Sequence, residues 1–183
     1  MTTEEAVPNT GSPTRDRAYP AALVVLLLVQ LLIGLYGIDQ TPQFGHQGYH
    51  VAEHGLGARN LNRWGTLTHT THHGPGKPPE ASLNFHHLTM LQVPVWITQS
   101  AFGDQSAWPV RVVGLFFSLA AALGIWLFAR KARGPAVAVV VAAAFVFNPL
   151  HVAFGNLPDI QMVSIAWLSW AGVALLALFE RPA

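Results

Sequence analysis

The chain has 183 residues, of which 51% are hydrophobic and only 10% are charged, and its formal net charge is +1. A soluble globular domain carries about 25% charged residues, so this composition favours a protein embedded in a bilayer. The ten lysines and arginines form no basic stripe, which argues against nucleic acid as a partner, and the lack of cysteine excludes disulfides and thiolate chemistry.

Residues 1–17 are polar, rich in proline and glycine, and without apolar periodicity, which predicts a short disordered tail on the cytoplasmic side. Residues 21–38 form an apolar run interrupted only by Gln30. As a helix this run would extend about 27 Å, enough to cross a hydrocarbon core. A cleaved signal peptide is the alternative interpretation, but no small-x-small cleavage site follows the run. We therefore expect the first transmembrane helix here and a membrane domain over residues 18–183.

Residues 39–108 form a long polar loop that ends in a short apolar stretch, residues 88–102, whose length fits an interfacial helix better than a span. Three further apolar runs follow at residues 109–129, 135–151 and 158–179. The sequence therefore predicts an all-α integral membrane protein with about four transmembrane helices.

Basic residues decide how these segments are oriented, because lysine and arginine concentrate on the cytoplasmic side of a membrane. If residues 88–102 lie flat, the N-terminus is cytoplasmic and the loop 39–108 shares the outer face with the turn at residues 155–159. All six of the relevant basic residues then fall on the cytoplasmic side: Arg15, Arg17, Arg130, Lys131, Arg133 and Arg181.

The loop holds eight of the nine histidines, and two groups have the spacing of metal ligands. The patterns are His50-Val-Ala-Glu-His54 and His69-Thr-Thr-His72-His73, which are similar to those of membrane di-iron desaturases and hydroxylases. Histidines four apart share one face of a helix, so the first pair could hold a metal beside Glu53. The second group lies among glycines and prolines, which predict an irregular loop. A metal enzyme with these five histidines as ligands is one alternative.

A second set of motifs runs through most of the chain in a fixed order. It comprises A-R-N-L-x-R-W-G (58–65), G-P and P-P-E (74–80), F-H-H-L (85–88), W-P-V-R (108–111), N-P-L-H (148–151) and L-P-D (157–159). This order resembles the amino-terminal part of polytopic membrane glycosyltransferases of the type C fold, the protein mannosyltransferase and aminoarabinose transferase type. The resemblance implies that the loop 39–108 contains two juxtamembrane helices.

The resemblance also implies an activity, the transfer of a sugar from a polyprenyl-phosphate carrier to an acceptor hydroxyl on the outer face, with inversion. Such a reaction needs a base for the acceptor proton and groups that bind the leaving phosphate. Asp159 matches one of the family's two acids, and His46 or Glu53 would replace the other, which this sequence lacks. The carrier phosphate would contact His86, His87 and Arg59.

For each of these residues a purely structural role is the alternative: a helix-terminal charge for Asp159, and capping, packing or solvation for the others. The implied partners are membrane lipid and the polyprenyl-phosphate sugar donor. No cofactor is required, although a divalent metal is compatible with the reaction.

The family usually has more transmembrane helices than this chain. The sequence is therefore interpreted as a truncated piece of such an enzyme, as a short relative that works with a further membrane subunit, or as a non-catalytic membrane scaffold. The expected location is the inner membrane of a bacterium.

Overall fold

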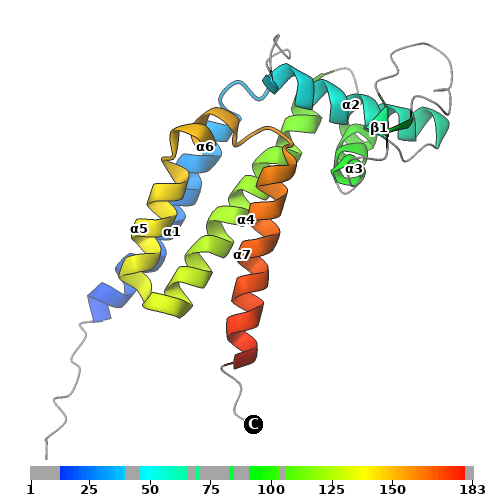
Figure 1. Ribbon diagram of the computed structural model, residues 1–183. Coiled ribbons are helices and arrows are strands. Elements are labelled where there is room, and N and C mark those ends of the chain that lie inside the picture. The colour runs from blue at the N-terminus through cyan, green and yellow to red at the C-terminus, as the bar shows by residue number, and fades with distance from the viewer. Residues whose placement is uncertain are drawn as a thin grey trace, which may run out of the picture.

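The computed structural model describes residues 13–39, 46–65, 69–70, 83–84, 91–103 and 106–179. Within these residues the chain is almost entirely helical, and Figure 1 shows the order of the helices. They are α1 (Pro13–Leu35), α2 (His46–Trp64), α3 (Gln92–Phe102), α4 (Trp108–Arg133), α5 (Pro135–Val146), α6 (Pro149–Phe154) and α7 (Ile160–Phe179). Two short strands, β1 (His69–Thr70) and β2 (Leu83–Asn84), pair antiparallel with His69 opposite Asn84.

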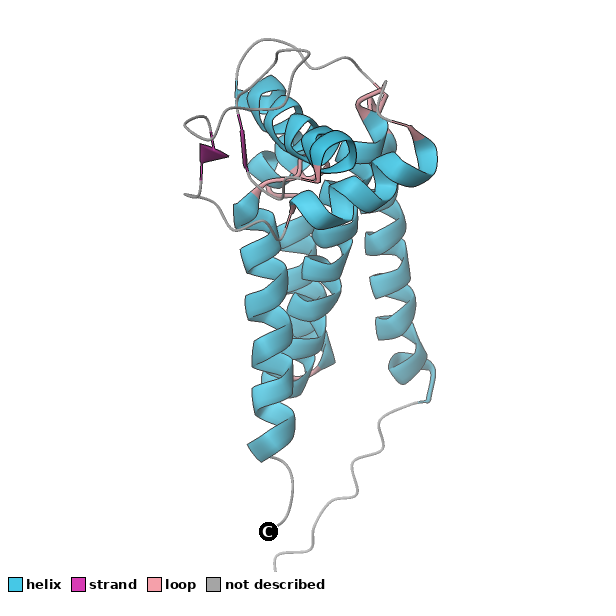
Figure 2. Ribbon diagram, turned by 90° about the vertical axis from the view of Figure 1, so that its right-hand side faces the viewer, coloured by secondary structure: helices cyan, strands magenta, loops and turns pink. Residues whose placement is uncertain are grey.

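The helices form a bundle with α4 at its centre, in contact with α1, α3, α5 and α7. The helices α2 and α3, which we call the platform, lie across one end of this bundle, the platform end (Figures 1 and 2). Three helical segments are long and apolar enough to cross a membrane: Ala18–Leu35, Trp108–Arg133 and Ile160–Phe179. They correspond to three of the four spans predicted from the sequence.

The fourth predicted span, residues 135–151, is not one continuous helix. The helix α5 has 12 residues and therefore extends only about 18 Å, short of a hydrocarbon core of about 30 Å. Proline has no N–H and disfavours a helical conformation in the residue before it, so Pro149 ends the run at Asn148. Asn148 is extended, and its Oδ1 accepts a hydrogen bond from the N–H of Leu150 at 2.9 Å, which starts α6. Four complete spans are therefore not confirmed.

The ends of other elements also differ from the sequence prediction. The first helix begins at Pro13, so residues 13–17 are helical rather than part of a disordered tail. In the segment predicted at residues 88–102, α3 covers Gln92–Phe102, and residues 88–90 lie outside the described part of the chain. The loop 39–108 does contain two helices, α2 and α3, and neither is among the segments long and apolar enough to span.

Small residues on α4 allow its neighbours to approach closely, as is common between helices in membranes. A Cβ atom added at Gly114 would meet the backbone of Leu157, and one at Gly124 would meet the Ser169 side chain of α7. Near the second contact, Nε1 of Trp170 donates a hydrogen bond of 3.0 Å to the carbonyl oxygen of Ala120. The close packing of α7 on α4 thus depends on side chains that are absent or small.

The platform is joined to the bundle by one apolar cluster, so α2 and α3 are part of the same folded unit as α4 and α7. It consists of Val51, Ala58, Leu91, Val95, Ala107, Val110, Val113, Leu157 and Val163. Glycines in α2 bring α3 close, because a Cβ atom at Gly57 would lie 2.8 Å from Nε2 of Gln92. The platform therefore has a fixed position over the end of the bundle that holds the α6–α7 loop.

Candidate functional site

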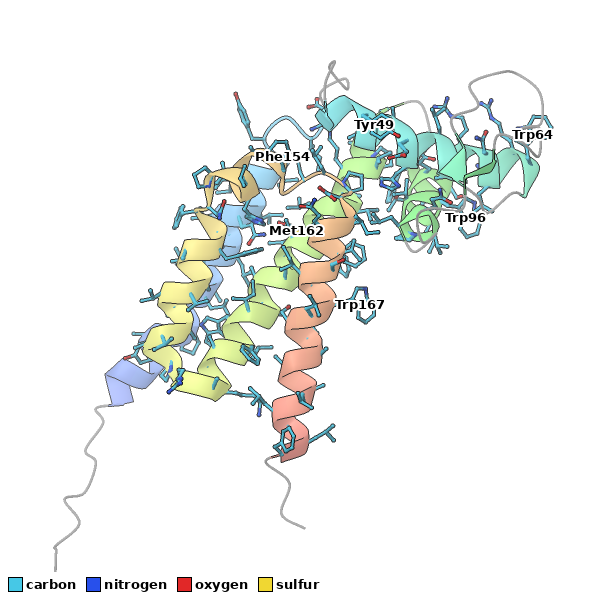
Figure 3. All side chains as sticks on the ribbon, viewed as in Figure 1. Tyr49, Trp64, Trp96, Phe154, Met162 and Trp167 are labelled. Atoms are coloured by element: carbon cyan, nitrogen blue, oxygen red, sulfur yellow. The ribbon has the colours of Figure 1, made fainter. Side chains whose placement is uncertain are left out.

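A cavity of about 390 Å³ lies between α5, α6 and the start of α7, near the platform end. Figure 3 labels Phe154 on α6 and Met162 on α7, two of its lining residues. Its polar lining residues are Asn148, His151, Asp159 and Gln161, and its apolar ones are Phe145, Leu150, Phe154, Met162 and Ile165. A cavity with both kinds of wall suits a ligand that has a polar and an apolar part.

Asp159, the predicted catalytic acid, lines this cavity and is half-buried. Its Oδ1 accepts a hydrogen bond of 2.9 Å from the N–H of Gln161, which is the geometry of an N-terminal helix cap. The structural role weighed for Asp159 is therefore present. It does not compete with a chemical role, since the cap uses one carboxylate oxygen and a carboxylate has two.

The loop that carries Asp159 is held against two helices of the bundle. The Asn156 side chain donates a hydrogen bond of 3.1 Å from Nδ2 to the carbonyl oxygen of Gly34 on α1. Leu157 and Pro158 are buried, and the backbone of Leu157 lies against Gly114 of α4. Asp159 thus sits at a position defined by α1 and α4 as well as by its own helix.

Below this loop lies a buried group of three polar side chains, Gln30, Ser118 and His151, which we call the polar cluster. Nε2 of Gln30 donates to Oγ of Ser118 at 2.6 Å and lies 3.0 Å from Nε2 of His151. Oγ of Ser118 lies 3.1 Å from the same His151 nitrogen. The exposed fractions of the three side chains are only 3%, 1% and 8%, so the hydrogen bonds are shielded from solvent.

Sequence reasoning missed the polar cluster, although a signal was present. Gln30 is the one polar residue in the first apolar run, Ser118 interrupts the second, and His151 ends the N-P-L-H motif. Isolated polar residues in apolar helices usually pair with one another, because an unpaired polar group is costly there. The sequence could not show that these three positions, on α1, α4 and α6, meet.

The predicted site residues on α2 occupy a different region. Glu53 and His54 are buried and Arg59 is half-buried. The Tyr49 hydroxyl donates to Oε1 of Glu53 at 2.9 Å, and this hydrogen bond, together with the negative charge of Glu53, raises the pKa of Tyr49. Glu53 is not among the described residues that line the Asp159 cavity.

Most of the predicted histidines are described only in part. His46 and His50 belong to α2 and His69 to β1, but their side chains lie outside the described part of the structure. His72, His73, His86 and His87 lie outside the described residues altogether. Within the described residues no group of three or more His, Asp or Glu side chains is placed to hold a metal ion. The metal alternative stays a prediction.

A buried arginine is a second feature that the sequence analysis did not single out. Arg111, the last residue of the W-P-V-R motif, is buried one turn into α4. Its Nε has no hydrogen-bond partner among the described residues. The position inside an apolar helix was the available signal, because a charge there usually has a specific partner.

No family model, no curated protein and no solved structure matches this chain. The resemblance to type C glycosyltransferases therefore depends on the order of the sequence motifs. The geometry of the Asp159 cavity is an independent observation, and the two together define what can be proposed.

Proposed function

We propose that this chain transfers a sugar from a polyprenyl-phosphate carrier to an acceptor hydroxyl, either as part of a larger enzyme or with a further membrane subunit. The observation that carries the proposal is the position of Asp159. The motif resemblance matches this residue to an acid of the family, and its carboxylate lines a cavity with polar and apolar walls. A carboxylate that can accept a proton, placed beside such a cavity, suits a sugar donor that has a polar sugar phosphate and an apolar polyprenyl chain.

In the proposed reaction, the oxygen of the acceptor hydroxyl attacks the anomeric carbon of the sugar, and Asp159 accepts the proton of that hydroxyl. The bond between this carbon and the phosphate oxygen breaks, and the polyprenyl phosphate leaves with the electron pair. Cationic or hydrogen-bonding groups must stabilise that phosphate. His86, His87 and Arg59 are proposed for this role from the motif resemblance. Glu53 or His46 is proposed, on the same basis, as the second polar group, although Glu53 is not among the described residues that line the Asp159 cavity.

The proposal includes an orientation in the membrane. The three long apolar helices would cross the inner membrane of a bacterium, with α5 and α6 as the fourth segment of the bundle. The N-terminus and the basic residues Arg130, Lys131 and Arg133 would face the cytoplasm. The platform, the α6–α7 loop and the Asp159 cavity would then share the outer side.

A non-catalytic scaffold is the second candidate, and one observation favours it. Oδ1 of Asp159 already caps α7, so the carboxylate has a structural reason to be present. The two candidates differ in what the charge does, because a cap needs only an oxygen acceptor whereas a base needs a carboxylate.

The substitution Asp159→Asn separates the two candidates, since asparagine caps a helix about as well as aspartate but cannot take the proton. The assay would use membranes containing the full assembly, with a polyprenyl-phosphate sugar as donor, and would measure product formation. We expect turnover to fall by about 10² or more with little change in the KM of the carrier.

A matched control is Ser164→Ala on α7, because among the described residues the exposed Ser164 hydroxyl bonds only to the backbone oxygen of Ile160 on its own helix. This variant should keep the parent turnover. If the Asp159→Asn variant also kept it, the catalytic role of Asp159 would be excluded and the scaffold would be favoured.

A further inference from the structure

We infer that Gln30 and Ser118 are positioning residues that act through His151 to fix the loop carrying Asp159. The kinetic part of this inference rests on the proposed function, whereas its structural part does not.

The hydrogen bonds of the polar cluster converge on one atom, Nε2 of His151. Nε2 of Gln30 lies 3.0 Å from this nitrogen, within hydrogen-bond distance. The hydroxyl of Ser118, 3.1 Å away, is the second group at the same atom. One imidazole thus links α6 to α1 and to α4.

From His151 the constraint continues along the chain to Asp159. The N–H of Gly155 donates to the His151 carbonyl oxygen at 2.7 Å, and the N–H of Leu157 donates to the Phe154 carbonyl oxygen at 2.9 Å. A Cβ atom at Gly155 would lie 2.6 Å from the His151 oxygen and 3.1 Å from Oγ of Ser118. Gly155 is therefore packed directly on the polar cluster, four residues before Asp159.

Stability alone does not account for a glutamine at position 30. Its Oε1 has no hydrogen-bond partner among the described residues, and a buried polar atom without a partner is unfavourable. Methionine has a similar length and no such atom. If Gln30 were replaced by methionine, Ser118 and His151 would still have each other as partners. Gln30 thus provides a directional contact with His151 that methionine could not make, and a positioning role requires such a contact.

Two substitutions test this inference. Gln30→Met removes the link from α1 while leaving the Ser118–His151 pair, and His151→Leu removes the hub of the polar cluster. The structural measurement is hydrogen exchange of the backbone amides of Gly155, Leu157 and Asp159 in the full chain. Because each substitution removes two of the three contacts within the polar cluster, we expect exchange at least about threefold faster in both variants. The Ser164→Ala control should exchange at the parent rate.

The kinetic measurement uses the membrane assay with the polyprenyl-phosphate sugar donor. Both variants should lower kcat by about tenfold while the carrier KM stays within about twofold, since a displaced base affects the reaction more than ground-state binding. His151→Gln places an amide near the position of Nε2 and should recover most of the kcat lost in His151→Leu. Recovery by this variant would not follow from a role in packing alone.

The outcomes separate this inference from the proposed function. Unchanged exchange in the Gln30→Met variant overturns the inference whatever the activity, and faster exchange with unchanged kcat overturns the positioning role. If the parent protein transfers no sugar, the proposed function fails and the exchange rates alone decide whether the polar cluster fixes the loop. If His151→Leu does not fold, Gln30→Met decides the result.

Discussion

The close approach of the α6–α7 loop to Gly114 gives the most direct test of how Asp159 is placed. Gly114→Ala would add a Cβ atom that meets the backbone of Leu157 and lies 2.8 Å from the carbonyl carbon of Asn156. Both neighbours are backbone atoms of a buried loop, so no side-chain rotation can relieve the contact. The loop must therefore move away from α4.

The expected effect follows from two opposing contributions. Overpacking a well-packed core costs about 1–3 kcal/mol, and a backbone contact places Gly114→Ala near the upper end. Replacing glycine by alanine within a helix returns about 1 kcal/mol. The net loss of stability is then about 2 kcal/mol, which lowers the melting temperature by about 4–8 °C for a chain of this size. A loop displaced by about 1 Å would also lower turnover by as much as 10².

A second glycine supplies the matched control. A Cβ atom at Gly34 would meet Cδ1 of the buried Leu115, a side chain rather than backbone, so movement of that side chain can relieve part of the contact. Gly34→Ala should therefore lower the melting temperature by less than Gly114→Ala. Thermal unfolding of both variants in detergent, followed by the sugar-transfer assay, compares them directly. Equal melting temperatures for Gly114→Ala and Gly34→Ala would refute the close packing of the loop on α4.

Two further predictions concern the platform and the orientation of the chain. Gly57→Ala should have a lower melting temperature than Gly55→Ala. A Cβ atom at Gly57 would lie 2.8 Å from Nε2 of the buried Gln92, whereas one at Gly55 would come no closer than 3.3 Å to a neighbouring atom. Equal melting temperatures would contradict the α2–α3 contact. A topology reporter fused after Arg133 should be cytoplasmic and one at Gly76 should be outside. Finding residue 133 outside would reverse the proposed orientation.

The helical character and the three long apolar helices were predictable because apolar runs of this length have few alternatives in a membrane protein. The position of the break near Pro149 was also visible in the sequence, but its consequence was not. Proline can kink a helix or end it, and here the extended Asn148 before Pro149 caps a new helix, α6. The prediction of a continuous fourth helix missed this local competition.

The candidate site was predictable to a smaller extent. Asp159 was found from a motif, and the cavity beside it became visible only with the arrangement of α5, α6 and α7. Gln30, Ser118 and His151 are separated by 88 and 33 residues along the chain, so no local pattern could bring them together. Glu53 and Arg59 were chosen for their chemistry, whereas their burial in the platform depends on α3 packing over α2.

The break between α5 and α6 has a consequence for how deeply water can enter the protein. Where a helix stops inside a bilayer, its last carbonyl groups need partners, and such backbone is tolerated only within protein or beside water. Asn148 at this break also lines the Asp159 cavity. If the bundle spans the membrane as proposed, the dry barrier beneath the cavity has the length of α5, about 18 Å instead of about 30 Å. The Asp159 carboxylate, at the outer end of the 20-residue α7, would then be hydrated through this cavity.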